Sequence, residues 1–303
     1  MKRMIALLAL LVLLLAGCAP AAGAPAAALL TLDTGVSPEA WARVPAGPFL
    51  MGQHEHEMLV DYDYEVMVTP VTNAQYARYL NEALAKGTVK IADGWVVGHY
   101  DGDPFSNHRH EKEIAAGDWP QFPLANEDAR LTFDGQAFAV RPGYEMHPVT
   151  MVTWFGAKGY SDFYGYRLPT EVEWEKAARG TDGRAYPWGA EIAGHNANYS
   201  GSGDPFERNV GKLGNTTPVG FYNGKTYDGY ATVNSPSPYG LYDMAGNVWE
   251  WTADVNPGAH YRFMRGGSRA DYGFDLRVWT RNNAEPHYAS PSVGFRCVRT
   301  VTK

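Results

Sequence analysis

The sequence predicts one large domain of mixed helix and strand in which much of the backbone is irregular. Aromatic residues make up 13% of the 303 residues, and glycine occurs 33 times. This composition is typical of a loop-rich globule whose core is filled by tryptophan and tyrosine. Beyond the N-terminal segment, about 260 residues remain without an internal repeat or a second Pro/Gly-rich break, so we expect a single domain.

Local signals predict two short helices. Residues 73–86 follow a Thr72 cap and carry apolar side chains at helical spacing. Residues 170–179 open with Thr170 and Glu173, which have the spacing of a capping box. We expect both helices to serve as scaffold.

The N-terminus reads as a secretion signal with a lipidation site. A charged start is followed by an apolar stretch from Met4 to Leu15 and by the run Leu15-Ala-Gly-Cys18. The apolar stretch is too short to cross a bilayer comfortably and fits a cleaved signal peptide over residues 1–17. Cys18 would then carry lipid and anchor the protein to a membrane in the cell envelope. The uncharged Ala/Pro/Gly segment that follows predicts a tether over residues 18–40, with the domain at 41–303.

The charge balance disfavours nucleic acid as a partner. The formal net charge is −7, and loss of Lys2 and Arg3 with a signal peptide would make it −9. Nucleic acids select basic surfaces. The lipid anchor, rather than the domain's own charge, would hold the protein at the membrane.

The run from Tyr239 to Trp251 alternates acidic, glycine and tryptophan residues too tightly for an ordinary helix or strand. Asp243 and Glu250 supply carboxylates, and Gly246 allows a bend with positive φ. Carboxylates and main-chain carbonyls together are the ligands that calcium prefers. The alternative is an aromatic-rich turn whose carboxylates cap backbone N–H groups.

Two histidine pairs offer a partial site for a transition metal such as Fe or Cu. Each pair has one residue between its members, so on a strand the two imidazoles would face the same side. If both pairs converged, they would form a metal centre without thiolates. The alternative is that both lie in polar surface loops. The pairs are His54 with His56, and His108 with His110.

Cysteine usage excludes a disulfide framework. Cys18 and Cys297 are the only cysteines. If Cys18 carries lipid, Cys297 has no partner. We expect Cys297 to be a buried free thiol.

Eight blocks of the sequence, in order between Val44 and Arg299, resemble the formylglycine-generating enzyme family. Its members include sulfatase-modifying factors, ergothioneine-pathway sulfoxide synthases and pyoverdine-maturation proteins. The resemblance implies an α+β fold, a loop-rich variant of the C-type lectin fold. The blocks are residues 44–52, 70–76, 147–149, 167–179, 186–189, 239–251, 265–268 and 294–297.

The resemblance also assigns candidate site residues. It implies one calcium site at Asp243, Gly246, Val248 and Glu250. A second calcium site would use Asn198 and Tyr199, although the family's later aspartate has no counterpart near residues 211–214. The family's groove would be lined by Trp249, Arg269, Arg277 and Arg281. Arginines in a cleft suit anionic or peptide ligands, and the alternative is that they tie irregular loops to backbone carbonyls.

The sequence departs from the family in two places. The family's type reaction uses a copper-binding cysteine pair, and the corresponding stretch, Arg269 to Arg281, contains no cysteine. Residues 86–141 form an insertion, with a hairpin predicted at 132–140 around an Asp134–Gly135 turn. Such insertions commonly carry specificity, and the alternative is a surface excursion without a role.

Two functions are therefore open. The first is a divergent oxidoreductase-like protein that does not make formylglycine by the cysteine and copper route. The second is a non-catalytic, calcium-stabilised lipoprotein that binds or assembles a ligand. The ligand would be a secreted protein or a small molecule.

Overall fold

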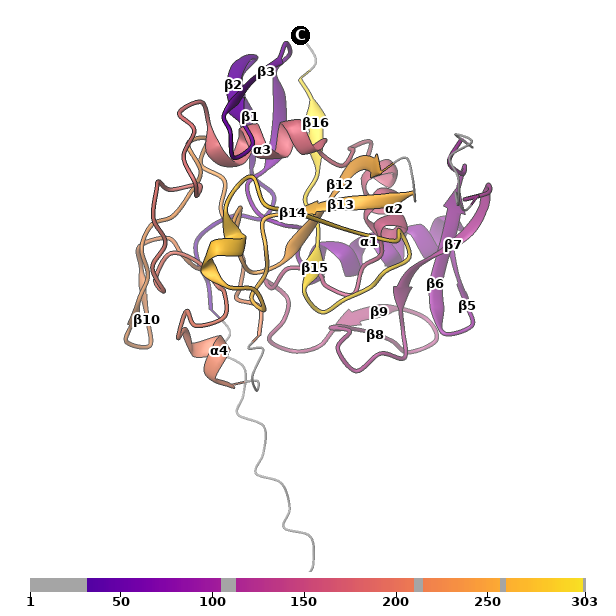
Figure 1. Ribbon diagram of the computed structural model, residues 1–303. Helices are drawn as coiled ribbons and strands as arrows, with labels where there is room; N and C mark the ends of the chain where they lie inside the picture. The colour runs from indigo at the N-terminus through magenta and orange to yellow at the C-terminus, as the bar shows by residue number, and fades with distance from the viewer. Residues whose placement is uncertain (1–31, 105–112, 210–214, 257–259, 302–303) are drawn as a thin grey trace, which may run out of the picture.

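The computed structural model describes residues 32–104, 113–209, 215–256 and 260–301 (Figure 1). These residues form a mixed α+β fold in which short strands and a few helices are joined by long irregular segments, as the sequence predicts. The helices are α1 (Asn73–Lys86), α2 (Trp154–Phe163), α3 (Glu171–Arg179) and α4 (Pro205–Asn209), with a 3-10 turn, η2 (Gly273–Leu276).

The capping signals place α1 and α3 where the sequence predicts them. At the start of α1, Thr72 Oγ1 accepts a hydrogen bond from the Gln75 N–H, and the Gln75 side chain accepts one from the Thr72 N–H. Thr170 and Glu173 make the same reciprocal pair at the start of α3. These bonds satisfy N–H groups that have no partner inside the helix.

The sheet that carries the candidate site has the strand order β14-β13-β12-β15. β12 is antiparallel to β13 and parallel to β15, and its register shifts between Trp251 and Val255. α3 packs against β12 and β13, and Trp174 Nε1 of α3 donates to the Glu250 carboxylate of β12 at 2.8 Å, whereas Trp251 is buried in a separate cluster. The strands are β12 (Trp249–Asn256), β13 (Tyr261–Arg265), β14 (Arg281–Ala284) and β15 (Val293–Gly294).

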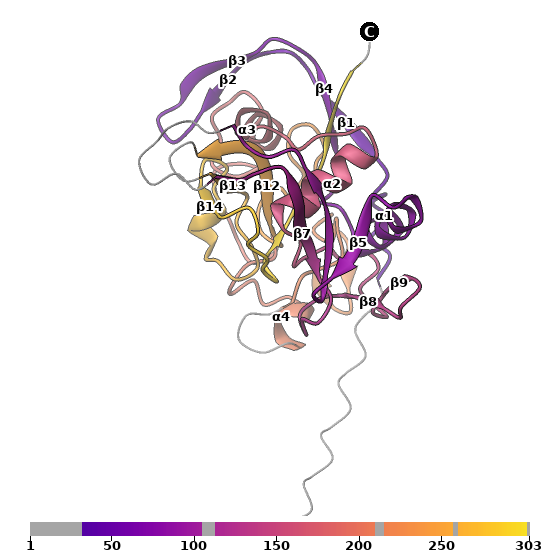
Figure 2. The same cartoon turned by 90° about the vertical axis from the view of Figure 1, so that its right-hand side faces the viewer.

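Both ends of the domain meet in one sheet, with the order β1-β4-β16. β2 and β3 form a hairpin that arches over α3 (Figure 2). The strands are β1 (Trp41–Val44), β4 (Tyr64–Met67), β16 (Val298–Thr300), β2 (Gly47–Met51) and β3 (His56–Val60).

The predicted insertion folds into two units. β5, β6 and β7 form a sheet that contacts α1 and α2, and β8 with β9 forms the predicted hairpin. In that hairpin Asp134 Oδ1 accepts hydrogen bonds from the Gln136 and Ala137 N–H groups, which fixes the turn. The strands are β5 (Val89–Ala92), β6 (Trp95–Tyr100), β7 (Gly117–Pro123), β8 (Leu131–Phe133) and β9 (Phe138–Val140).

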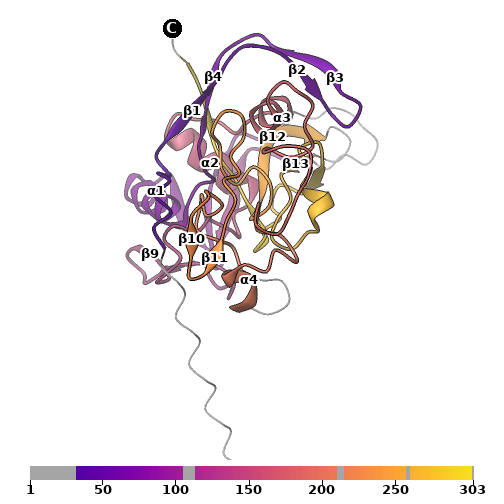
Figure 3. The same cartoon turned by 90° about the vertical axis from the view of Figure 1, so that its left-hand side faces the viewer.

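The core is rich in aromatic side chains, as the composition predicts. Tyr76 stacks on Tyr160 with ring centroids 6.0 Å apart, and Tyr79 lies edge-on to Tyr160 at 5.4 Å. A smaller aromatic cluster joins α4 to the short hairpin of β10 (Thr226–Tyr227) and β11 (Tyr230–Ala231) (Figure 3). Aromatic packing thus replaces extended sheet in holding the irregular segments together.

The packed part of the chain begins before Trp41. Thr34 is buried, and its hydroxyl donates to the Val219 carbonyl at 2.9 Å. The predicted signal peptide, Cys18 and the first part of the tether lie outside the described residues. In the part of the chain that the structure describes, no helix combines the length and the apolar character needed to cross a membrane.

Candidate functional site

A cavity of about 350 Å³ opens at one end of the β12–β13–β14 sheet, between the chain that follows β13 and the chain that precedes β15. Trp249, which the resemblance places in the family's groove, lies on its wall. The wall combines this aromatic side chain with hydroxyl, amide and carboxylate groups, a surface suited to a polar ligand. It includes Trp249, Ser268, Asp271, Asn282, Tyr288 and Ser292.

A tight turn after β13 brings Ser268 and Asp271 to the cavity. Gly267 has a φ of 71°, and a Cβ added there would lie 2.9 Å from Leu276 Cδ1, so only glycine fits. The Ser268 N–H and hydroxyl both donate to Asp271 Oδ2, at 2.9 and 2.5 Å. The Asp271 carboxylate is thereby tied to its own loop.

The three arginines predicted for the groove lie in different surroundings. Arg281 has a side chain that is 57% exposed, and it pairs with Glu171 at 3.2 Å. Arg277 packs over the rings of Phe274 and Trp279. Arg269 reaches the wall of the cavity through Ser292, whose Oγ accepts a hydrogen bond from Arg269 Nη1 at 2.6 Å.

The buried guanidinium of Arg269 has no carboxylate partner. The residue is 8% exposed, and its Nε is buried without a hydrogen-bond acceptor. Within the described residues no carboxylate lies at ion-pair distance from it. Burial, together with the positive charge of Arg130, lowers the pKa of Arg269, against the opposing influence of Asp128 and Asp271. A buried cation of this kind is costly unless a negative group reaches it.

Every other arginine that is buried among the described residues has a carboxylate partner. Two of these arginines pair with carboxylates of the helix α3 and two with carboxylates elsewhere, and all four pairings neutralise charge inside the scaffold. The pairs are Arg179 with Glu175, Arg262 with Asp103, Arg265 with Glu171 and Glu175, and Arg296 with Glu250.

In the structure, Glu250 forms a buried ion pair with Arg296. Arg296 donates through Nε to Oε2 and through Nη2 to Oε1, each at 2.7 Å, and Trp174 Nε1 donates to Oε2 at 2.8 Å. Both Glu250 and Arg296 are fully buried. Both oxygens of Glu250 therefore accept from protein donors, and a role for Glu250 as a calcium ligand stays a prediction.

The remaining members of the predicted calcium site are engaged within the same bend. Asp243 Oδ2 accepts from the Gly220 N–H at 2.7 Å, and the Gly246 carbonyl accepts from the Val248 N–H at 2.8 Å. Burial raises the pKa of Asp243 to about 6, while the charge of Arg296 opposes that rise. Arg296 therefore supplies positive charge to this bend, and calcium binding here stays a prediction.

The residues predicted for a second calcium site also have protein partners. Asn198 is buried, its Nδ2 donates to the Asn215 carbonyl at 2.9 Å, and its own carbonyl accepts from the Asn247 N–H at 2.8 Å. Tyr199 is half-buried against an apolar cluster. These contacts hold the loop, and a second calcium ion stays a prediction.

The predicted transition-metal site falls partly outside the described residues. His54 and His56 lie at the tip of the β2–β3 hairpin, exposed, with ring centroids 6.3 Å apart. His108 and His110 are not among the described residues, so convergence of the two pairs stays a prediction. Within the described part, no three His, Cys, Asp or Glu side chains gather as a metal-binding group.

The expectation for Cys297 is confirmed. It is a free thiol, fully buried, with its sulfur 3.3 Å from the Ser161 hydroxyl. Burial raises the pKa of this thiol to about 12. It is therefore protonated and inert at neutral pH.

Sequence reasoning missed the partners that these residues meet across the fold. Arg296 lies in one of the eight quoted blocks, yet no local signal links it to Glu250, which is 46 positions away. Arg130 comes from the insertion and carries no motif. The sequence could not have singled out Arg269 by the absence of a neighbouring acidic residue. Most carboxylate partners of the other buried arginines are also distant in the sequence, so sequence proximity does not show which arginine is paired.

The fold and the arrangement around β12 define a domain of the sulfatase-modifying-factor type. The solved structure of PvdO from Pseudomonas aeruginosa has the same fold, with a TM-score of 0.55 and 22% identity over 86% of this chain and 94% of that one. Residues 28–301 match the sulfatase-modifying factor enzyme 1-like domain. The chain belongs to this family, which contains the formylglycine-generating enzymes.

Several curated proteins are similar over most of this chain. The inactive C-alpha-formylglycine-generating enzyme 2 of Mus musculus is 32% identical over 86% of this chain and 86% of its own length. The formylglycine-generating enzyme of Thermomonospora curvata is 35% identical over 84% and 91%. The serine/threonine-protein kinase pkn1 of Chlamydia caviae is 30% identical over 85% of this chain, which spans only 37% of that protein.

Proposed function

We propose that this protein is a lipid-anchored, extracytoplasmic member of the family that binds an anionic ligand beside Trp249 and does not make formylglycine. The observation that carries this proposal is the buried guanidinium of Arg269, which lacks a carboxylate at the edge of a cavity of about 350 Å³. A ligand carboxylate would supply the missing charge. Bidentate pairing with a carboxylate is the interaction for which an arginine is best shaped.

The surroundings of the cavity favour an acidic segment of a secreted protein as the ligand. Tyr288 lines the cavity and is 45% exposed, while Tyr272 and Phe274 in the neighbouring loop are 69% and 62% exposed. Exposed aromatic side chains around a charged anchor are characteristic of protein recognition surfaces. A small carboxylate would engage Arg269 alone, whereas a peptide would also cover these rings.

The thiol chemistry of this chain supports a role other than formylglycine formation. Cys297 is buried with a raised pKa, and Cys18 is the predicted lipidation site. Copper binding by the family's route needs a pair of thiolates. The mouse relative is itself named an inactive enzyme. A divergent oxidoreductase-like role would need a metal held by other residues, and the exposed pair of His54 and His56 is the described feature that favours it.

Calorimetric titration with a short acidic peptide tests the proposal. The probe is an acetylated, amidated heptapeptide with one central glutamate, and its glutamine counterpart is the ligand control. Arg269→Gln should weaken binding at least about tenfold, since hydrogen bonds to a charged group contribute roughly 1.5–3 kcal/mol. Arg43→Gln, which removes an exposed arginine on β1 away from the cavity, should leave the affinity unchanged.

Two results would contradict this proposal. One is equal binding of the glutamate and glutamine peptides, and the other is equal loss of affinity in both arginine variants. Metal analysis of the same preparation addresses the oxidoreductase alternative. Stoichiometric Fe or Cu that is lost when His54 and His56 are replaced by alanine would favour that alternative.

A further inference from the structure

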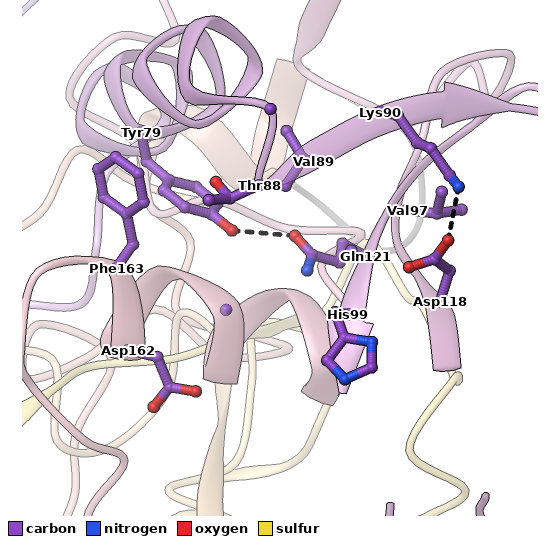
Figure 4. A pocket seen from close by; sticks show the side chains of 13 residues that line it. Tyr79, Thr88, Val89, Lys90, Val97, His99, Asp118, Gln121, Asp162 and Phe163 are labelled. Atoms are coloured by element: carbon purple, nitrogen blue, oxygen red, sulfur yellow. Dashed lines mark hydrogen bonds and ion pairs between the residues drawn. The ribbon is translucent and has the colours of Figure 1, made fainter. Parts of the chain in front are cut away.

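A second cavity, of about 440 Å³, lies in the insertion, away from Arg269 and Trp249. It opens between the β5–β6–β7 sheet and the helices α1 and α2 (Figure 4). Its walls carry polar groups from all of these elements. They include Tyr79, Lys90, His99, Asp118, Gln121 and Asp162.

The floor of this cavity holds a buried amide with unused donors. Gln121 is 3% exposed, and its Oε1 accepts a hydrogen bond from the Tyr79 hydroxyl at 3.0 Å. Its Nε2 carries two N–H donors and has no acceptor among the described residues. Figure 4 shows this nitrogen turned away from Tyr79, toward the helix that carries Asp162. Because Gln121 lines the cavity, a ligand that enters it can accept hydrogen bonds from these donors.

Two glycines make room for this amide at the cavity wall. A Cβ added to Gly98 of β6 would lie 2.2 Å from Gln121 Nε2. A Cβ added to Gly159 of α2 would lie 2.7 Å from the same nitrogen and 2.8 Å from the Tyr79 hydroxyl. Any larger residue at either position would displace the amide or cover it.

The charges around the cavity exclude most ligand classes. Asp118 pairs with Lys90 at 2.6 Å, and Asp162 pairs with Lys158 at 2.6 Å. An anionic ligand would be repelled by these two carboxylates. A cation would find both carboxylates already paired and would leave the Gln121 donors unmet. A hydroxyl group suits the site, because it accepts from the amide and donates to a carboxylate at the same time.

We propose that this cavity binds a neutral, polyhydroxylated ligand, namely a sugar residue of a glycan. One hydroxyl accepts from Gln121 Nε2, and a neighbouring hydroxyl donates to Asp162. The cavity volume lies in the range of small-molecule sites. This cavity is separate from the anion site at Arg269, so an experiment can refute either proposal without affecting the other.

Nuclear magnetic resonance of the full chain, in a detergent without sugar headgroups, tests this site. The probes are glucose, galactose, mannose, N-acetylglucosamine and their disaccharides. At least one should shift the side-chain amide signal of Gln121 in a saturable way. Gly159→Ala should abolish that binding, and Asp162→Asn should weaken it at least about tenfold. Asp93→Asn removes a charge from the β5–β6 turn outside the cavity and should change nothing.

The proposal is overturned if no sugar in the panel shifts the Gln121 signal saturably. It is also overturned if Asp162→Asn and Asp93→Asn bind equally well, a comparison that holds even if Gly159→Ala does not fold. Saturation of the same signal by acetate or butylammonium, and not by sugars, would replace the neutral ligand with a charged one.

Discussion

Replacing Glu250 with glutamine should destabilise the protein strongly, because it leaves Arg296 buried without a counter-charge. Both side chains are fully buried and joined by two hydrogen bonds of 2.7 Å. Glutamine keeps one oxygen acceptor but turns an NH₂ group toward the arginine donors. Breaking a buried pair from one side costs about 3–5 kcal/mol. At roughly 2 °C per kcal/mol for a domain of this size, the melting temperature should fall by about 6–10 °C.

Thermal unfolding followed by circular dichroism measures this loss, with Glu65→Gln as the matched control. Glu65 pairs with Arg299 at 2.6 Å, but the two side chains are 29% and 40% exposed, so its loss should cost less than about 1 kcal/mol. The Glu250→Gln loss should be the same in EGTA and in millimolar calcium. If the loss appears only in calcium, Glu250 acts through an ion and our reasoning from Arg296 fails.

Four further outcomes are expected. Burial lowers the pKa of His147 to about 3, so below about pH 6.5 only the unfolded state takes up a proton at this residue. The free energy of unfolding should therefore decrease by about 2 kcal/mol as the pH is lowered from 7 to 5. His147→Gln should remove that part of the decrease in denaturant titrations. Cys18→Ala should move the protein from the membrane fraction to the soluble fraction or leave an uncleaved precursor; unchanged fractionation and mass would rule out lipidation. A Cys-x-Pro-x-Arg peptide incubated with protein, copper, reductant and oxygen should keep its mass, and conversion of its cysteine to an aldehyde would reveal a thiol-independent route. The wild-type melting temperature should rise by a few degrees when calcium is added to metal-free protein; an unchanged melting temperature in EGTA and in calcium would leave the bend around Asp243 as a structural turn only.

Features set by neighbouring residues could be predicted from the sequence. The capping boxes at Thr72 and Thr170 locate α1 and α3, and the Asp134 turn locates the β8–β9 hairpin. Each of these rests on contacts within a few residues, which local spacing specifies.

The candidate sites depend on partners that local spacing does not specify. Glu250 meets an arginine 46 residues away, and Tyr79 meets Gln121 at a separation of 42 residues. The resemblance grouped Arg269, Arg277 and Arg281 in one groove, whereas their surroundings range from buried to exposed. The charge state of a side chain follows from these distant contacts, so the sequence could name candidate residues without separating scaffold from site.

The hydrogen bonds of the buried arginines distinguish Arg269 from the other buried arginines. An irregular backbone leaves many carbonyls without a partner, and arginine has enough donors to reach several at once. Arg296 donates to the Met67 and Tyr242 carbonyls, Arg179 to those of Gly52 and Gly183, and Arg265 to that of Val278. Each also has a carboxylate that offsets its charge. The Arg269 guanidinium makes neither contact within the described residues and donates only to Ser292 Oγ. Loop tethering therefore explains the other buried arginines but leaves the burial of Arg269 uncompensated, whereas an anionic ligand in the adjoining cavity would compensate it.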